Sequence, residues 1–269
     1  MIKKCLYPVA GSGTRFLPVT KSIAKEMLPI LETPLLQYAV EEAISANIKT
    51  QVMVLNQQKE SIKDYFSAKP NLEETLSADK KLLLNNINSI IKKCGFSYTY
   101  QKKPKGLGDA IKEGEELING DDFAVILPDD LCVNDNESVL QQMIEVYNKY
   151  HCSIVAIEEV PMDKVHQYGV ISGIEVEKNV FKIDDMIEKP NSEEAPTNLA
   201  IIGRYILTND IFEIIKKTPA GKGGEVQITD ALLTQAKQGK VLAYKFKGKR
   251  YDCGSIDGFV EATNHFYNK

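Results

Sequence analysis

The sequence predicts an α/β protein, because strand-like apolar segments alternate with helical patterns along most of its 269 residues. Residues 123–127 are continuously apolar, which is typical of a strand buried on both faces of a parallel sheet. No Ser-, Gly- or Pro-rich linker divides the chain. We therefore expect one domain over 1–269, with elaborations in its second half. Its expected fold is a Rossmann-like three-layer α/β/α sandwich with a mixed, mostly parallel central sheet and a small additional β region.

The first half of the chain is expected to contain both helices and strands. In order these are a strand at 2–9, a helix at 35–44, a strand at 52–55, a long polar helix at 71–94, and strands at 96–100 and 123–127. Gly11-Ser12-Gly13 ends the first strand, and Thr33-Pro34 supplies the N-cap and N1 residue types of a helix start. Gly95 is expected to end the long helix, whose apolar stripe is Leu83, Leu84, Ile87, Ile90 and Ile91.

The second half is expected to hold more strand. Its expected helices are 138–150, 209–217, 226–238 and 256–266, and its expected strands are 153–159, 168–172, 180–187, 199–207 and 241–247. Residues 190–198 and 218–224 are expected to be surface loops. Ser255 is the best-placed N-cap for the last helix.

Composition and charge exclude several classes of protein. With 33 Lys+Arg against 37 Asp+Glu the net charge is −4, whereas proteins that bind nucleic acid by bulk charge usually carry a basic excess. No apolar run approaches the roughly 18 residues of a membrane span. The apolar stretch at the N-terminus, broken by Pro8, is too short for a secretory signal. The five cysteines form no C-x-x-C pair, so we expect a cytoplasmic protein without a disulfide framework.

A glycine-containing loop, Gly11-Ser12-Gly13-Thr14-Arg15, directly follows the first expected strand. Glycines at the carboxyl end of a strand let backbone amides approach a phosphate or a base. Phe16 stands where the dinucleotide fingerprint needs a third glycine, and no Gly-Lys-Ser/Thr of a P-loop follows. Arg15, Lys21 and Lys25 then add positive charge. The segment is either a plain turn beside a solvated basic face or a rigid loop around a polyphosphate.

Acidic residues follow the expected strand 123–127 as Asp129 and Asp130, and Asp252 lies in a similar strand-to-turn position. Ligands of open α/β sheets bind outside the carboxyl ends of the strands, and Mg²⁺ prefers one or two carboxylates with water and phosphate oxygens. Turn chemistry is the alternative for Pro128-Asp129-Asp130. Glu188-Lys189 stands at a third strand end, where a solvated surface pair is the alternative.

Several motifs together resemble the sugar-1-phosphate nucleotidylyltransferases, and within that family the bacterial uridylyltransferases that act on glucose 1-phosphate. The resemblance runs in order from residue 2 to about residue 266. Its motifs are 9–18 (VAGSGTRFLP), 25–29 (KEMLP), 101–108 (QKKPKGLG), 127–130 (LPDD), 168–170 (YGV), 188–190 (EKP), 198–200 (NLA), 203–205 (GRY), 225–230 (EVQITD) and 250–254 (RYDCG).

By this resemblance the chain would transfer a uridylyl group from UTP to glucose 1-phosphate, with Mg²⁺ as cofactor, and would form a homodimer or homotetramer. Arg15, Lys25 and Lys189 would be catalytic, the first two on the triphosphate and Lys189 on the sugar phosphate. Asp129 and Asp252 would hold the metal, and the sugar would lie against Gly169, Glu188, Lys189 and Glu225. The resemblance further implies a nucleotide site made of Ala10, Gly11, Gly13, Thr14, Glu26, Gln101 and Gly106.

Three residues depart from the family pattern, namely Val9, Ala24 and Asp109. Asp109 stands where the uridylyltransferases usually have His, and it would add a negative charge beside the base pocket. This leaves open an enzyme that uses TTP or another hexose 1-phosphate. A nicotinamide or flavin oxidoreductase is disfavoured by Phe16. A catalytically silent sensor of sugar nucleotides is disfavoured because the carboxylates and lysines of the family pattern are present.

Overall fold

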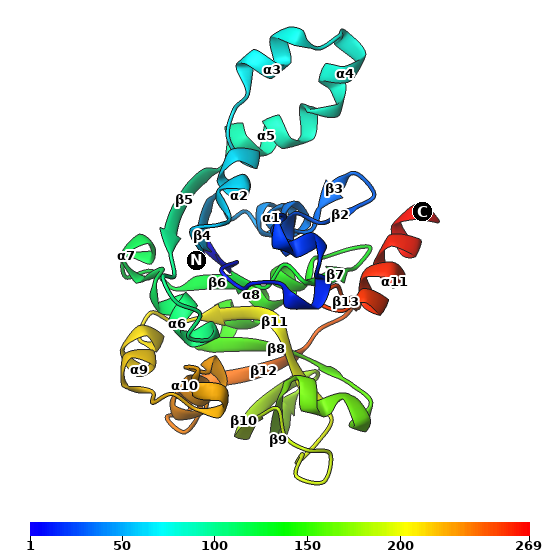
Figure 1. Ribbon diagram of the computed structural model, residues 1–269. Coiled ribbons are helices and arrows are strands. Elements are labelled where there is room, and N and C mark those ends of the chain that lie inside the picture. Colours follow the sequence, from blue (N-terminus) through cyan, green and yellow to red (C-terminus); the bar gives the residue numbers. More distant parts are fainter.

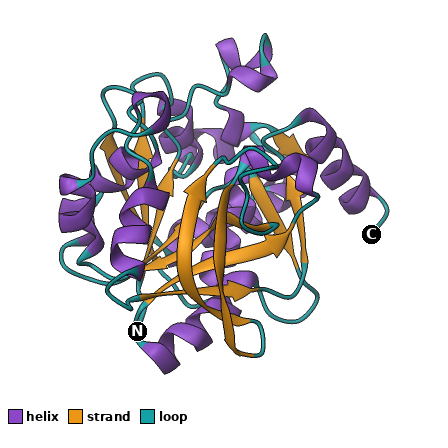
Figure 2. Ribbon diagram, turned by 90° about the horizontal axis from the view of Figure 1, so that it is seen from below, coloured by secondary structure: helices purple, strands orange, loops and turns teal.

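A nine-stranded mixed sheet forms the centre of the computed structural model, which describes the backbone of residues 1–269 and every side chain except that of Lys222 (Figures 1 and 2). In spatial order its strands are β5 (Gly95–Tyr100), β4 (Thr50–Leu55), β1 (Lys4–Pro8), β6 (Phe123–Ile126), β11 (Leu199–Leu207), β8 (Ser153–Glu159), β12 (Val241–Lys245), β10 (Val180–Glu188) and β9 (Gly169–Glu177). A mixed α/β fold is thus confirmed.

The two halves of the sheet differ in strand direction. Strands β5, β4, β1 and β6 are parallel to one another, as predicted. Beyond them, β11 runs antiparallel to both its neighbours, and the β9–β10 hairpin is antiparallel too. The prediction of a mostly parallel sheet is therefore wrong for the second half, where the short Lys178-Asn179 connection permits only an antiparallel pair. Ala200 of β11 also pairs with Val170 of β9, so the second half curls into a partly barrel-like sheet.

Helices cover both faces of the sheet. On one face lie α1 (Leu35–Ser45), α2 (Glu60–Tyr65), α5 (Asn85–Lys93) and α8 (Val139–Tyr150). On the other lie α6 (Leu107–Lys112), α7 (Glu115–Ile118), α9 (Ile211–Lys217) and α10 (Ile228–Ala236). Side chains alternate along each strand, so Cys5 and Tyr7 of β1 join the first core and Leu6 joins the second.

Two small sheets lie beside the main one. Strand β7 (Asp130–Val133) pairs with β13 (Lys249–Asp252), and β2 (Pro29–Ile30) pairs with β3 (Thr33–Pro34). Helix α11 (Ile256–Tyr267) packs beside them over a core that includes Leu131 and Tyr251. Short 3₁₀ helices occupy η1 (Thr14–Phe16), η2 (Val19–Lys21), η3 (Lys25–Met27), η4 (Met162–Gln167) and η5 (Lys222–Gly224).

The segment expected as one helix at 71–94 is three short helices, α3 (Pro70–Thr75), α4 (Ala78–Leu83) and α5. The chain is extended at Leu76, which ends α3. The segment projects from the body of the molecule (Figure 1), so little of it has a surface to pack against. Leu83 is 81% exposed, whereas Ile87 and Ile90 reach the core.

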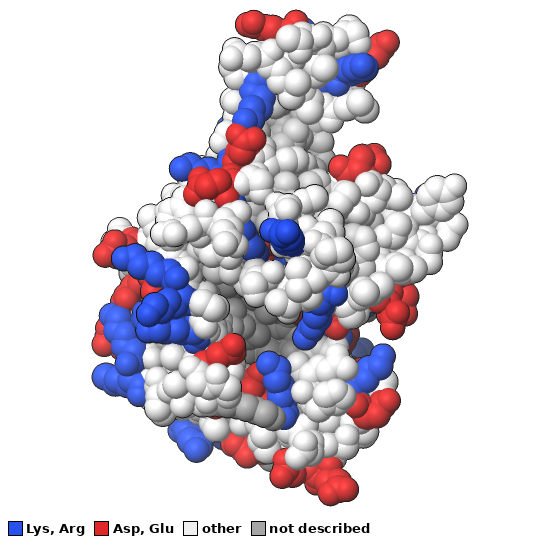
Figure 3. All heavy atoms as spheres, in the orientation of Figure 1, with Lys and Arg blue, Asp and Glu red and all other residues white. Residues whose placement is uncertain are grey.

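Two helix starts were predicted from capping residues. The first is confirmed, because Ser255 caps α11 by accepting a hydrogen bond from the Gly258 amide, whereas α1 begins at Leu35, one residue later than predicted. Pro34, however, is the N-cap of α1 and part of β3, and is not the first helical residue. No described helix combines the length and the apolar character that crossing a membrane requires. Acidic and basic side chains both occur across the face shown in Figure 3.

Candidate active site

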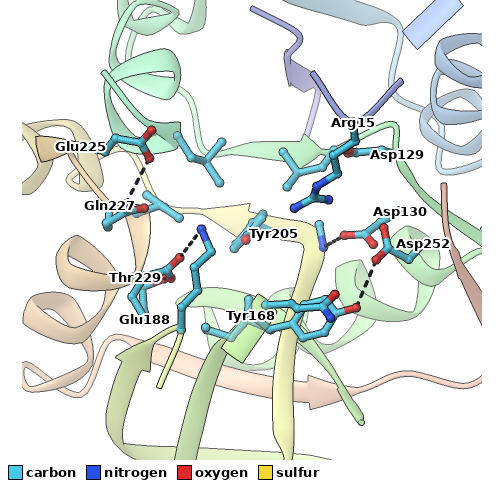
Figure 4. Close-up of a pocket in the computed structure, with 18 residues that line it drawn as sticks. Arg15, Asp129, Asp130, Tyr168, Glu188, Tyr205, Glu225, Gln227, Thr229 and Asp252 are labelled. Atoms are coloured by element: carbon cyan, nitrogen blue, oxygen red, sulfur yellow. Dashed lines mark hydrogen bonds and ion pairs between the residues drawn. The ribbon is translucent and has the colours of Figure 1, made fainter. Parts of the chain in front are cut away.

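A cavity of about 300 Å³ opens between the parallel half of the sheet and the curled second half (Figure 4). It contains polar groups from the ends of several strands. Seven residues predicted from the sequence line it, namely Arg15, Asp129, Gly169, Glu188, Lys189, Glu225 and Asp252. They are separated by up to 237 positions in the chain (252 − 15), so only the fold brings them together.

The two predicted metal ligands, Asp129 and Asp252, face each other across Gly254. Backbone contacts fix this arrangement, because β13 pairs with β7 and the Cys253 amide donates to the Asp129 carbonyl at 2.7 Å. A Cβ atom placed on Gly254 would lie 3.0 Å from Asp252 Oδ1 and 3.2 Å from Asp129 Oδ2. Two carboxylates in such a small space fit Mg²⁺, which takes its remaining ligands from water and phosphate. The described residues hold no larger cluster of His, Cys, Asp or Glu suited to a metal.

Lys25 forms an ion pair with Asp129, with 2.6 Å between Nζ and Oδ2. Burial disfavours the ammonium form of Lys25, but the neighbouring carboxylate outweighs burial and raises the pKa of this lysine. Burial likewise disfavours the carboxylate of Asp129, but Lys25 lowers its pKa below the usual value. Both groups are consequently charged at neutral pH.

A second charged network lies beneath the two carboxylates. Asp130 accepts hydrogen bonds from the Gly203 amide at 2.7 Å and from Arg250 Nη1 at 2.6 Å. Arg250 also pairs with Glu158 and donates to the Tyr168 hydroxyl at 3.0 Å. The hydroxyl in turn donates to Asp252 Oδ2 at 3.3 Å. Sequence reasoning assigned no role to this network, although Tyr168 and Arg250 open two of the motifs that carry the family resemblance.

The opposite wall of the cavity carries Glu188, Lys189 and Glu225. Glu188 accepts a hydrogen bond from Thr229 Oγ1 at 2.6 Å and lies 3.3 Å from Lys189 Nζ. Glu188 also lies close to Gly169, and a Cβ atom on Gly169 would be only 3.2 Å from Glu188 Oε2. The missing side chain of Gly169 therefore makes room for the Glu188 carboxylate. Gln227 Nε2 donates to Glu225 at 3.3 Å. Figure 4 shows Glu188 and Glu225 on this wall, opposite Arg15, and Lys189 also lines the cavity.

The glycine loop forms a second, adjoining hollow of about 220 Å³. This hollow shares Arg15 and Asp129 with the main cavity and also contains Gly13, Thr14 and Lys25. Gly13 adopts a positive φ of 66°, a conformation that glycine takes without strain, and its carbonyl accepts from Thr20 Oγ1 at 2.7 Å. Lys21 lines another hollow on the loop, together with Lys25 and Lys59.

Five of the predicted nucleotide-binding residues lie outside the linings of these two hollows. Ala10 directly precedes the glycine loop and Gly11 begins it, and Asn56 Nδ2 donates to the Ala10 carbonyl at 2.7 Å. Glu26 is only 2% exposed and forms an ion pair with Lys59 at 2.6 Å. Gln101 and Gly106 remain, and they lie on the segment that leads from β5 to α6.

Gly106 packs against the cavity wall. It has a φ of 98°, and a Cβ on it would lie 2.8 Å from the Cβ of Glu225, closer than real side chains approach. The Val226 amide donates to the Lys105 carbonyl at 2.8 Å, and the Gly108 amide donates to the Val226 carbonyl at 2.9 Å. The segment around Gly106 is therefore joined to the wall that carries Glu225.

Asp109, which the sequence predicts to add a negative charge beside the base pocket, is paired within the protein. It is 5% exposed and forms an ion pair with Lys112 at 2.7 Å. Its other oxygen accepts from Gln101 Nε2 at 2.9 Å. Burial alone would disfavour the carboxylate, but the hydrogen bonds from Lys112 and Gln101 lower its pKa.

Comparisons with known proteins identify the family of the chain. The nucleotidyl transferase family model matches residues 9–269. The UTP–glucose-1-phosphate uridylyltransferase of Pseudomonas aeruginosa is 55% identical over 269 residues, covering 99% of this chain and 96% of the relative. The enzyme of that name from Bacillus subtilis is 40% identical over 266 residues, covering 98% of this chain and 91% of the relative.

Solved structures give the same picture. A UDP-glucose pyrophosphorylase complexed with UDP-glucose matches with a TM-score of 0.93 and 57% identity, covering 100% of this chain and 99% of that one. A UTP-bound UGPase from Acinetobacter baumannii matches with a TM-score of 0.90 and 37% identity, covering 99% and 93%. The family match spans nearly all of the chain and the relatives align almost end to end, so the chain belongs to the nucleotidyl transferase family.

Proposed function

We propose that this protein transfers the uridylyl group of UTP to glucose 1-phosphate, which yields UDP-glucose and pyrophosphate. One observation carries the proposal: a single cavity combines Arg15, two facing carboxylates and, on the opposite wall, Lys189 beside Glu188. Such a cavity suits two phosphorylated substrates and a cation. The named activity of the relatives and the ligands of the two solved structures support the choice of UTP and glucose.

The reaction needs positioning and positive charge more than a base. In it, a phosphate oxygen of the sugar phosphate attacks the α-phosphorus of UTP, and pyrophosphate leaves. That oxygen is already anionic near neutral pH, since the second pKa of a phosphate monoester is about 6. Catalysis then depends on in-line alignment and on cations that offset the charge of two polyanions.

Each charged residue has a place in this scheme. Arg15 and Lys25 would bind the triphosphate, and Lys189 would bind the phosphate of the sugar. Asp129 and Asp252 would hold Mg²⁺, which supplies charge neutralisation at phosphate oxygens when bound. Lys25 and Asp129 are each other's partners at 2.6 Å. When the nucleotide binds, Lys25 would exchange this contact for one with a phosphate.

The remaining assignments concern the base and the sugar. Gly13 and Thr14 would contact the nucleotide from the second hollow, and Ala10, Gly11, Glu26, Gln101 and Gly106 would border the base and ribose. Most of them lie in or next to the glycine loop, and Gln101 directly follows the parallel strand β5, at the strand end where such sheets bind ligands. Glu26 lies in η3, and Gly106 directly precedes α6. Gly169, Glu188 and Glu225 would contact the sugar hydroxyls, since both carboxylates line the cavity beside Lys189.

The wider setting of the enzyme is part of the same proposal. A match over residues 9–269 supports one nucleotidyltransferase domain of Rossmann-like α/β/α type, and the five free cysteines suit a reducing cytoplasm. We expect small-molecule partners and neither nucleic acid nor membrane. A homodimer or homotetramer stays a prediction from the family resemblance, which the mass of the particle in solution tests.

A pyrophosphate-release assay tests the function directly. The four nucleotides UTP, TTP, CTP and ATP are each combined with the 1-phosphates of glucose, galactose and mannose. We expect the highest kcat/KM for UTP with glucose 1-phosphate. A higher kcat/KM for TTP, or for another hexose 1-phosphate, would show the neighbouring specificity instead. Absence of release from every pair would overturn the proposal.

A further inference from the structure

We infer that Asp109 is a positioning residue for nucleotide specificity: together with the Gly106 carbonyl it fixes the side-chain amide of Gln101 so that only a hydrogen-bond acceptor is offered to the base. The inference deepens the proposed function and rests on it, because it takes Gln101 as a residue that borders the base. Its ligand class is a pyrimidine with an N3–H donor, which means uracil or thymine.

Two acceptors determine the orientation of the Gln101 amide. Its Nε2 atom donates to Asp109 Oδ2 at 2.9 Å and to the Gly106 carbonyl at 3.2 Å. An amide nitrogen has two N–H groups, so both are used within the protein. Turning the amide over would place its oxygen against a carboxylate and a carbonyl, and that arrangement leaves two acceptors facing a third.

The other atom of the amide, Oε1, stays available. No described residue donates a hydrogen bond to it. The buried polar side-chain atoms without a partner in the described structure are Gln235 Oε1 and His265 Nε2, so Gln101 Oε1 is reached by solvent. Gln101 as a whole residue is 6% exposed. Its backbone N–H donates to the Leu55 carbonyl at 2.8 Å, and this bond holds the Gln101 backbone at the end of β5.

Asp109 is itself held in place. Lys112 binds its second oxygen at 2.7 Å from the next turn of α6, so each carboxylate oxygen has its own donor. The resulting chain runs from Lys112 through Asp109 to Gln101. Within this chain the Asp109 carboxylate is the group that accepts one hydrogen bond from Lys112 and another from Gln101. The departure from the family pattern at position 109 thus has a chemical role.

Base discrimination follows from the single acceptor. Uracil and thymine place N3–H toward Gln101 Oε1, whereas cytosine in the same position presents the lone pair of N3. An acceptor facing an acceptor costs a hydrogen bond and leaves both groups unpaired. The methyl group that separates thymine from uracil lies on another edge of the ring, so this device does not distinguish UTP from TTP.

Substitution of Asp109 tests the inference through the ratio of kcat/KM for UTP to that for CTP. Asp109→Leu removes the acceptor, and we expect the ratio to fall about tenfold, the effect of losing one hydrogen bond between neutral groups, here Gln101 Oε1 and the base. Asp109→Asn keeps an oxygen that can face Gln101, and it should retain the wild-type ratio. The UTP/TTP ratio should stay constant in all variants. Asp109→Val, which also lacks an acceptor, replaces Asp109→Leu where that variant does not fold.

Lys112→Met is the matched control, because it breaks the ion pair but leaves the contact between Asp109 and Gln101. It should keep the UTP/CTP ratio, and the double variant D109L/K112M should show the low ratio of D109L. Recovery of the ratio in the double variant, or an unchanged ratio in D109L, would overturn the inference. Failure of the wild-type protein to use UTP would instead contradict the proposed function itself.

Discussion

Residues far apart in the chain supply the charges of the candidate site, and their pairing decides how they act. Asp129 and Lys25 form an ion pair at 2.6 Å. In the proposed function Asp129 instead binds a cation and Lys25 binds the triphosphate. Arg250 forms an ion pair with Asp130 and neutralises its charge. The carboxylates that face Gly254 are therefore those of Asp129 and Asp252. The amino-acid sequence indicated which residue types matter here. It could not indicate their partners, because an ion pair depends on three-dimensional distance.

Asp129→Asn should nearly abolish turnover while the fold stays intact. The amide is similar in shape but carries no charge, so it binds a cation weakly and no longer neutralises Lys25. Loss of one such electrostatic contact typically costs about 3 kcal/mol, or roughly 100-fold in rate. The kcat for UDP-glucose formation at saturating Mg²⁺ measures this, and circular dichroism checks the fold. Asp135→Asn, on an exposed side chain, is the control, and near-normal turnover in D129N would refute the metal assignment.

Lys189→Ala should act mainly on the sugar phosphate. Its ammonium group lies 3.3 Å from Glu188, at the cavity wall assigned to the sugar. Removing a hydrogen bond to a charged group costs about 2 kcal/mol, which corresponds to roughly a thirtyfold higher KM for glucose 1-phosphate. Lys182→Ala, an exposed lysine on β10, the strand that ends directly before Lys189, should change neither KM. A defect confined to the KM for UTP would show that Lys189 has another role.

Secondary-structure elements place these side chains by pairing and packing. The ladder of β7 with β13 aligns Asp130 with Asp252 and so brings together two motifs that are 122 positions apart (252 − 130). Short strands of this kind leave little periodicity in the sequence, so β7 and β13 were not predicted. By contrast β11 was predicted at its observed bounds, because its nine residues are almost continuously apolar and buried. The expected helix over 71–94 shows the opposite error, since helical spacing alone does not supply a surface to pack against.

Glu42→Gln should destabilise the fold, because Glu42 on α1 and Arg204 on β11 form a buried ion pair at 2.8 Å. Arg204 is 1% exposed, and it also donates to the Leu127 and Gly203 carbonyls beside the site. Removing one charge of such a pair typically costs about 3 kcal/mol. Urea unfolding should show this loss in the free energy of unfolding. Glu41→Gln, at the neighbouring position, should change it little, and an equal effect of the two substitutions would contradict the role of the pair.

At the scale of the whole molecule, a net charge of −4 coexists with a local cluster of cations. The composition excluded nucleic acid as an expected partner, but it was silent on phosphate chemistry, which needs only a few cations at fixed positions. The parallel half of the sheet follows from βα alternation and was predicted. The curl of the second half was not, since it depends on the pairing of Ala200 with Val170 across the sheet. The cavity lies between these two halves, so its shape could not be predicted from the sequence pattern of either half alone.

The most direct test of the central claim is the rate at which the purified protein forms UDP-glucose from UTP and glucose 1-phosphate, followed by phosphorus NMR with Mg²⁺ present. We predict stoichiometric appearance of UDP-glucose and pyrophosphate, with no product when either substrate is omitted. Hydrolysis of UTP without transfer, or no consumption of either substrate, would contradict the account.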